Sequence, residues 1–152
     1  MNHSALAELM AGTPFFEDMD RRYIDMFADC ATSASWDAGH YILLEGKPAH
    51  CFHIVLDGMV LIEAAGGNRG AIGIQSLTAG DVLGWSWMQP PYVWHFDALA
   101  TEDTQTIVVD ALCIRGKCEA DLALECELYK RFTALMTRRL LATRLQLMDI
   151  YS

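Results

Sequence analysis

Residues 80–98 carry the strongest local constraint in this sequence, because they fix where regular structure can run. Gly80 and Gly84 lie four residues apart, and glycine lets the backbone turn tightly or approach another group closely. Several aromatic residues follow, and the Pro90-Pro91 pair then interrupts any strand or helix. The segment therefore predicts the end of a strand, a glycine turn, a short helical turn and a proline kink.

A further strand is predicted directly after the prolines. Trp94, Phe96 and Ala98 alternate there with His95 and Asp97. Successive side chains on a strand point to opposite faces, so this alternation is typical of a strand with one buried face.

Short apolar segments separated by glycines surround this stretch and predict an antiparallel jelly-roll β-barrel over residues 35–110. The expected strands cover residues 41–44, 52–56, 59–63, 71–74 and 106–109, with a hairpin tip at residues 66–70. The fold class is therefore mainly β with flanking helices.

Helices are expected on both sides of the strands. Residues 1–34 read as N-terminal helices, in which Ser4 caps a first helix and Asp20 caps a second over residues 21–31. Residues 111–152 read as C-terminal helices, and 152 residues are the usual size of a single domain. We therefore expect one domain over residues 1–152.

Residues 80–98 resemble the phosphate-binding cassette of cyclic nucleotide-binding domains, as in the Crp/Fnr regulators. In that family a Gly-Glu pair opens a short helix, and an Arg followed by a small residue begins the next strand. Here Gly84 matches the glycine, Trp85 stands at the Glu position, and His95 and Phe96 stand at the Arg and small positions. A shift of one residue places Trp94 at the Arg position.

The resemblance extends over residues 13–150 and includes residues 138–143, which are similar to an Arg-Arg-Leu-x-x-Thr segment of Crp members. The resemblance implies that Thr143 is the contact to the ligand's base. The ligand-binding candidates are Gly84, Trp85, Ser86, Trp87, Trp94, His95, Phe96 and Thr143.

The aromatic candidates leave two interpretations open. Tryptophans can line a pocket for a planar or apolar ligand, or they can fill the space that a nucleotide would take. The cassette lacks the family's Glu and Arg, so cyclic AMP or cyclic GMP is possible but disfavoured. No cofactor is predicted.

A seam of residues repeats at spacings of four and three in the long C-terminal segment, which favours a homodimer through that helix. The seam residues are Met136, Leu140, Thr143, Leu147 and Ile150.

Catalytic and metal sites are not indicated. His50 and His53 lie three apart on an expected strand and so point to opposite faces, which suits chelation poorly. A haem would need an axial ligand, for which His95 and Cys51 are the candidates. The sequence shows no nucleophile–base pair, so the prediction is that the chain is not an enzyme.

The net charge of −9 disfavours binding to nucleic acid or to anionic membranes, so we expect no DNA binding by this chain alone and no membrane partner. The five cysteines are scattered and do not suggest a disulfide framework, and residues 1–10 lack a signal-peptide pattern. We therefore expect a cytoplasmic location.

The favoured hypothesis is a regulatory domain that senses an unidentified small molecule. The alternatives are a ligand-free interaction and dimerisation domain, and a cupin-like jelly-roll enzyme, which the missing metal triad disfavours.

Overall fold

The computed structural model describes every residue of the chain except Gly67, Arg69 and Ser152. The chain forms two compact units, Met1–Gly116 and Lys117–Ser152, which are described one after the other. The expectation of a single domain over residues 1–152 stays a prediction.

The first unit begins with two helices and a 3-10 turn, and polar side chains cap the two helices. The elements are α1 (His3–Ala11), η1 (Pro14–Phe16) and α2 (Arg21–Asp29). The Asp20 side chain accepts from the Arg22 N–H at 2.9 Å, as expected for the cap of α2. The cap of α1 is Asn2, which accepts from the Ala5 N–H at 2.8 Å, so the prediction of Ser4 as this cap was wrong.

The first strand starts earlier than the sequence indicated. The second helix ends at Asp29, and β1 (Ala31–Trp36) pairs with β8 along its whole length, from Ala31 opposite Val109 to Trp36 opposite Thr104. Pairing with a strand far along the chain decides this boundary, and local helix propensity does not.

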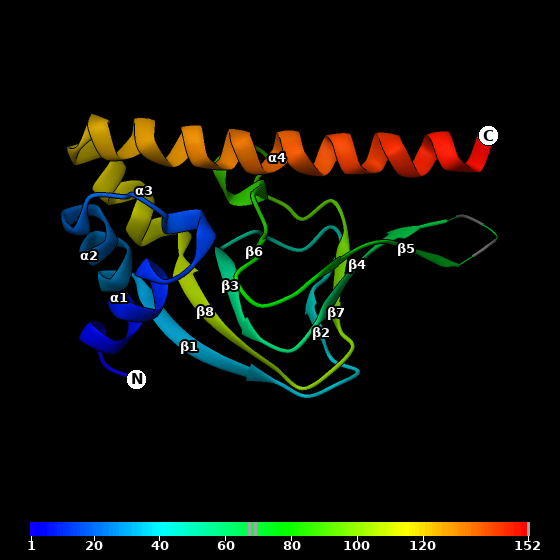
Figure 1. Ribbon diagram of the computed structural model, residues 1–152, viewed down its shortest axis with the longest axis horizontal. Coiled ribbons are helices and arrows are strands. Elements are labelled where there is room, and N and C mark those ends of the chain that lie inside the picture. The colour runs from blue at the N-terminus through cyan, green and yellow to red at the C-terminus, as the bar shows by residue number, and fades with distance from the viewer. Residues whose placement is uncertain (67, 69, 152) are drawn as a thin grey trace. The chain divides into compact units, whose positions relative to one another are not determined.

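Two antiparallel four-stranded sheets form the jelly roll, with strand orders β1-β8-β3-β6 and β2-β7-β4-β5 (Figure 1). The predicted jelly-roll fold is confirmed, although the two sheets do not close into a continuous barrel. The remaining strands are β2 (Tyr41–Leu43), β3 (Cys51–Asp57), β4 (Val60–Ala65), β5 (Ala71–Leu77), β6 (Val82–Leu83), β7 (Asp97–Ala100) and β8 (Thr104–Asp110).

The predicted hairpin tip at residues 66–70 lies partly outside the described residues. Its two ends are described: Ala65 pairs with Ala71, and the Gly66 N–H donates to the Gly70 carbonyl at 2.7 Å. This pairing is what a hairpin between β4 and β5 requires.

The two faces of strand β3 have different neighbours. Phe52 packs against Phe15 and Phe27 of the N-terminal elements, with ring centroids 6.4 and 6.3 Å away. Cys51 and His53 point to the other face of the strand, because side chains alternate along it. One face of β3 is thus covered by the N-terminal elements, and the other face is available to a cavity.

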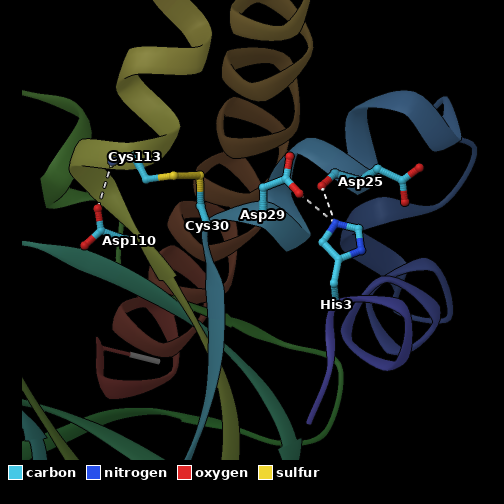
Figure 2. Close-up of a disulfide and its surroundings, with 6 residues drawn as sticks. All are labelled: His3, Asp25, Asp29, Cys30, Asp110 and Cys113. Atoms are coloured by element: carbon cyan, nitrogen blue, oxygen red, sulfur yellow. Dashed lines mark hydrogen bonds and ion pairs between the residues drawn. A yellow bond between two sulfur atoms is a disulfide. The ribbon is translucent and has the colours of Figure 1, made fainter.

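A disulfide joins Cys30, at the end of α2, to Cys113 of α3 (Ala111–Ala120) (Figure 2). The Asp110 carboxylate beside it accepts from the Cys113 N–H at 2.8 Å. The expectation that the cysteines form no disulfide was therefore wrong for this pair. The two residues are 83 apart in sequence, and only the fold brings them together.

The second unit is dominated by one long helix, α4 (Leu122–Tyr151), within the range over which C-terminal helices were expected. Asp121 caps it by accepting from the Leu124 N–H at 3.1 Å. No helix in the described part of the chain has the length and apolar character that crossing a bilayer needs.

Candidate ligand site

The segment after β6 has the local form that its glycines and prolines predicted. Gly84 ends the strand with a φ of +98°, a left-handed conformation that glycine adopts without strain. The 3-10 helix η3 (Ser86–Met88) follows, and the cis Pro90-Pro91 bond comes next. The outgoing segment then pairs with residues 46–49, where the Trp94 N–H donates to the Lys47 carbonyl at 3.0 Å.

The indole of Trp94 lies against Gly84. A Cβ built on Gly84 would come within 2.7 Å of two carbons of the Trp94 six-membered ring. Trp94 is buried, and Phe96 packs beside it and beside Trp85, with centroids 6.3 and 6.0 Å away. The sequence candidates Gly84, Trp85, Trp94 and Phe96 therefore form one aromatic cluster around the glycine turn.

Two other predicted site residues do not join this cluster. Trp87 is buried and stacks on Phe52 at 5.3 Å, so its ring belongs to the core under the N-terminal elements. His95 is exposed between two buried aromatic residues. Trp87 thus lies in the core and His95 faces solvent, and their roles as ligand contacts stay predictions.

The remaining two candidates are polar. Ser86 is buried, and its hydroxyl has no hydrogen-bond partner among the described residues. Thr143 lies in α4, where its hydroxyl donates to the Arg139 carbonyl at 2.9 Å within the same helix. Its predicted role as a base contact stays a prediction.

Arg115 of α3 supports the glycine–proline segment and was not anticipated. Its guanidinium donates to the Trp87 carbonyl at 2.7 Å and lies 4.5 Å from the centre of the Tyr92 ring. A cation over an aromatic face is attracted by the ring quadrupole. Arg115 lies far from both partners in sequence, so no local pattern pointed to this contact.

A cavity of about 470 Å³ lies beside the aromatic cluster. Trp94 lines it, so this one side chain contacts both the glycine turn and the cavity. The other lining residues come from β1, β2, β3, β8 and the segment between β2 and β3. They are Trp36, Tyr41, Ile42, Leu43, Leu44, Lys47, Pro48, His50, Cys51, His53 and Val108.

Three of the lining residues form a hydrogen-bonded chain with Thr106 of β8. The Trp36 Nε1–H donates to Thr106 Oγ1 at 3.1 Å, and His53 Nδ1 lies 3.2 Å from the same oxygen. His53 Nε2 lies 3.5 Å from Cys51 Sγ. The spacing Cys-x-His on a strand places both side chains on one face, and this signal in the sequence was overlooked.

Burial keeps this pair uncharged. It lowers the pKa of the His53 imidazole to about 4. Burial, with a smaller contribution from the charge of Asp110, raises the pKa of the Cys51 thiol to about 11. At neutral pH the site therefore holds a neutral imidazole and a thiol. Within the described residues, no three His, Cys, Asp or Glu side chains gather closely enough to hold a metal ion.

Comparison with known proteins agrees with this architecture. The family model for the cyclic nucleotide-binding domain matches residues 34–121, more than half of the chain. No curated protein matches at a significant level.

Solved structures share the fold. A cyclic nucleotide-binding domain from Methylobacillus flagellatus KT superposes with a TM-score of 0.82 at 17% identity, covering 97% of this chain and 83% of that one. The sensor domain of the transcriptional regulator DNR from Pseudomonas aeruginosa gives 0.72 at 15% identity, covering 91% and 93%.

A third similar structure is the regulatory subunit of a cAMP-independent protein kinase A from Trypanosoma brucei. It gives a TM-score of 0.73 at 18% identity, covering 88% of this chain and 47% of that one. With the family match over more than half of its residues, this chain belongs to the cyclic nucleotide-binding domain family.

Proposed function

We propose that this chain is a regulatory domain that senses a small molecule other than cyclic AMP or cyclic GMP. The observation that carries the proposal is the position of Trp94, which packs on Gly84 and at the same time lines the cavity. An aromatic side chain thus covers the glycine turn, while a separate space remains open beside it.

The charged groups that would hold a cyclic nucleotide are replaced. Trp85 takes the position of the family's Glu, and the exposed His95 takes the position of its Arg. A hydrogen bond to a charged group typically contributes about 1.5–3 kcal/mol, and two are missing. We expect both nucleotides to bind weakly or not at all.

The proposed role is not catalytic. A cysteine nucleophile needs a thiolate, usually formed beside a basic histidine. The pKa values of Cys51 and His53 are displaced in the directions that keep both groups neutral, which is the reverse of an activated pair.

Homodimerisation through α4 is part of the proposal. The seam residues Leu140, Leu147 and Ile150 are 64%, 54% and 74% exposed. Apolar side chains that repeat every three or four residues on an exposed helix are buried effectively by a second copy of the same helix. A structural change caused by ligand binding would then act on a dimer of two chains. The charge of −9 favours no DNA or membrane contact by this chain alone. The cytoplasmic setting also stays part of the proposal, although disulfides such as Cys30–Cys113 are rare in a reducing cytosol.

Titration calorimetry with cyclic AMP and cyclic GMP tests the nucleotide part. Binding at micromolar affinity or tighter would contradict it. Thermal unfolding with a panel of nucleotides, haem, organic acids and neutral aromatics tests the sensing part, because a ligand of the native state raises the melting temperature. A panel in which no class of compound raises it would favour the ligand-free dimerisation alternative.

A further inference from the structure

The cavity beside Trp94 has a polar inner end with one available donor. Trp36 Nε1 can only donate, so Thr106 Oγ1 accepts from it. The Thr106 hydroxyl hydrogen then has His53 Nδ1, 3.2 Å away, as its acceptor. In this arrangement Trp36 Nε1, Thr106 Oγ1 and His53 Nδ1 each have a hydrogen-bond partner, and the ring hydrogen of His53 is on Nε2.

The Nε2–H of His53 has only a weak partner in the described chain. It points to Cys51 Sγ at 3.5 Å, and a thiol sulfur is a poor acceptor. His53 is 3% exposed, so bulk water does not replace this partner freely. An oxygen of a bound molecule would be a better acceptor for the same hydrogen.

The cavity lining contains one lysine and no carboxylate, although the chain is acidic. Lys47 and His50 line the cavity and are exposed, and none of the lining residues is Asp or Glu. Lys47 forms no ion pair with any described residue. The Asp110 carboxylate, whose charge acts on the Cys51 thiol, is engaged in capping α3 at the Cys113 N–H. The Glu63 carboxylate accepts from the hydroxyl of the lining residue Tyr41 at 3.0 Å. In a chain of net charge −9, such a lining favours an anionic group at Lys47.

The backbone near Lys47 suits a carboxylate better than a phosphate. Phosphate sites usually offer several unpaired backbone N–H groups. Here the N–H groups of Gly46, Lys47 and Ala49 already donate to the carbonyls of residues 94, 44 and 92, and Pro48 has none. One flexible ammonium group remains, which is enough for a singly charged group.

The walls between these polar groups are apolar and partly aromatic. Trp36 and Trp94 supply flat surfaces, and Leu43 and Val108 supply aliphatic ones. A volume of about 470 Å³ is within the range of small-molecule sites, which is roughly 300–1,000 Å³.

We propose that this cavity binds a small aromatic carboxylic acid, with its carboxylate at Lys47, its ring between Trp36 and Trp94, and an inner acceptor atom at His53 Nε2. This site is separate from the glycine turn, because Trp94 lines the cavity and Gly84 does not. This inference rests on the proposed sensing function, because it names the ligand class of that sensor.

The test uses 6-hydroxy-2-naphthoic acid as the probe and 6-hydroxy-2-naphthamide as its neutral counterpart. The acid should bind the full chain, and Lys47→Gln should weaken it about three- to fivefold, the range for a partly exposed ion pair. The amide should bind wild type and Lys47→Gln equally. Lys130→Gln removes the same charge from a residue outside the cavity lining and should leave the acid's affinity unchanged.

The location is read from the indole N–H resonances, since the chain has four tryptophans. The acid should move the signals of Trp36 and Trp94 and leave that of Trp87, which stacks on Phe52 in the core. Failure of the acid to bind, equal affinity for wild type and Lys47→Gln, or unmoved Trp36 and Trp94 signals would overturn the inference. If another class of compound still raised the melting temperature, the sensing function would stand without this ligand class. If no class did, the sensing function would fail as well.

Discussion

The Trp94 indole occupies the space directly over Gly84, so that a single added Cβ would come within 2.7 Å of its ring carbons. Gly84 has a φ of +98°, and Trp94 is only 4% exposed. An aromatic side chain therefore covers this glycine turn, and the same side chain lines a cavity.

The substitution Gly84→Ala should destabilise the fold for two reasons. A positive φ costs a non-glycine residue about 1–2 kcal/mol, and displacing the buried indole adds about 1–3 kcal/mol. Gly39→Ala is the matched control, because Gly39 has a φ of +93° with no atom within 4 Å of an added Cβ. Urea unfolding should show the larger loss for Gly84→Ala. Equal losses of unfolding free energy in the two variants would show that Trp94 moves aside without destabilising the fold.

Stability should fall between pH 6.5 and pH 4 because of His53. In the unfolded chain this imidazole takes up a proton near pH 6.5, whereas in the folded chain burial lowers its pKa to about 4. The unfolded state thus binds more protons in this window, and the folded state loses about 2 kcal/mol between pH 7 and pH 5. Cys51, with a pKa of about 11, does not titrate there.

The variant His53→Gln isolates this effect. It should lower stability at pH 7, because the hydrogen bond to Thr106 changes, yet it should show a flatter dependence on pH than wild type. Urea midpoints at pH 7 and pH 5 provide the measurement. Parallel curves for the two proteins would mean that His53 is not the group responsible.

Reduction of the Cys30–Cys113 disulfide should destabilise the first unit by about 2–5 kcal/mol, as is typical when a native crosslink is removed. Dithiothreitol should shift the urea midpoint of wild type but not that of the Cys30→Ser/Cys113→Ser double variant. Cys126→Ser, which removes an exposed free thiol, is the control and should respond to reductant as wild type does. A wild-type midpoint unaffected by full reduction would contradict the prediction.

The α4 seam should hold two chains together at tens of micromolar. Leu140→Glu and Leu147→Glu place a charge on the seam and should give monomers in sedimentation equilibrium. Leu145→Glu is a close control, because Leu145 is 64% exposed, as Leu140 is, but lies off the seam. It should remain dimeric. Dissociation by Leu145→Glu alone, or a wild-type monomer, would argue against this seam.

Local patterns in the sequence determined much of the fold. The glycines and prolines of residues 80–98 set the turn, the short helical turn and the kink, because these residues restrict or free the backbone by themselves. Short apolar segments separated by glycines predicted β2, β3, β4, β5 and β8, and Asp20 marked the start of α2 through its own side-chain hydrogen bond.

The tertiary structure decided which of these residues meet. Trp94 over Gly84, Arg115 on Trp87, and Cys30 bonded to Cys113 all join segments separated in sequence. The same holds for β1, whose start at Ala31 is set by pairing with β8. The sequence placed Trp85, Trp94 and Phe96 in one segment, but whether they lined or filled a site depended on side-chain packing. Packing depends on the space left by residues far along the chain, and spacing within one segment does not contain that information.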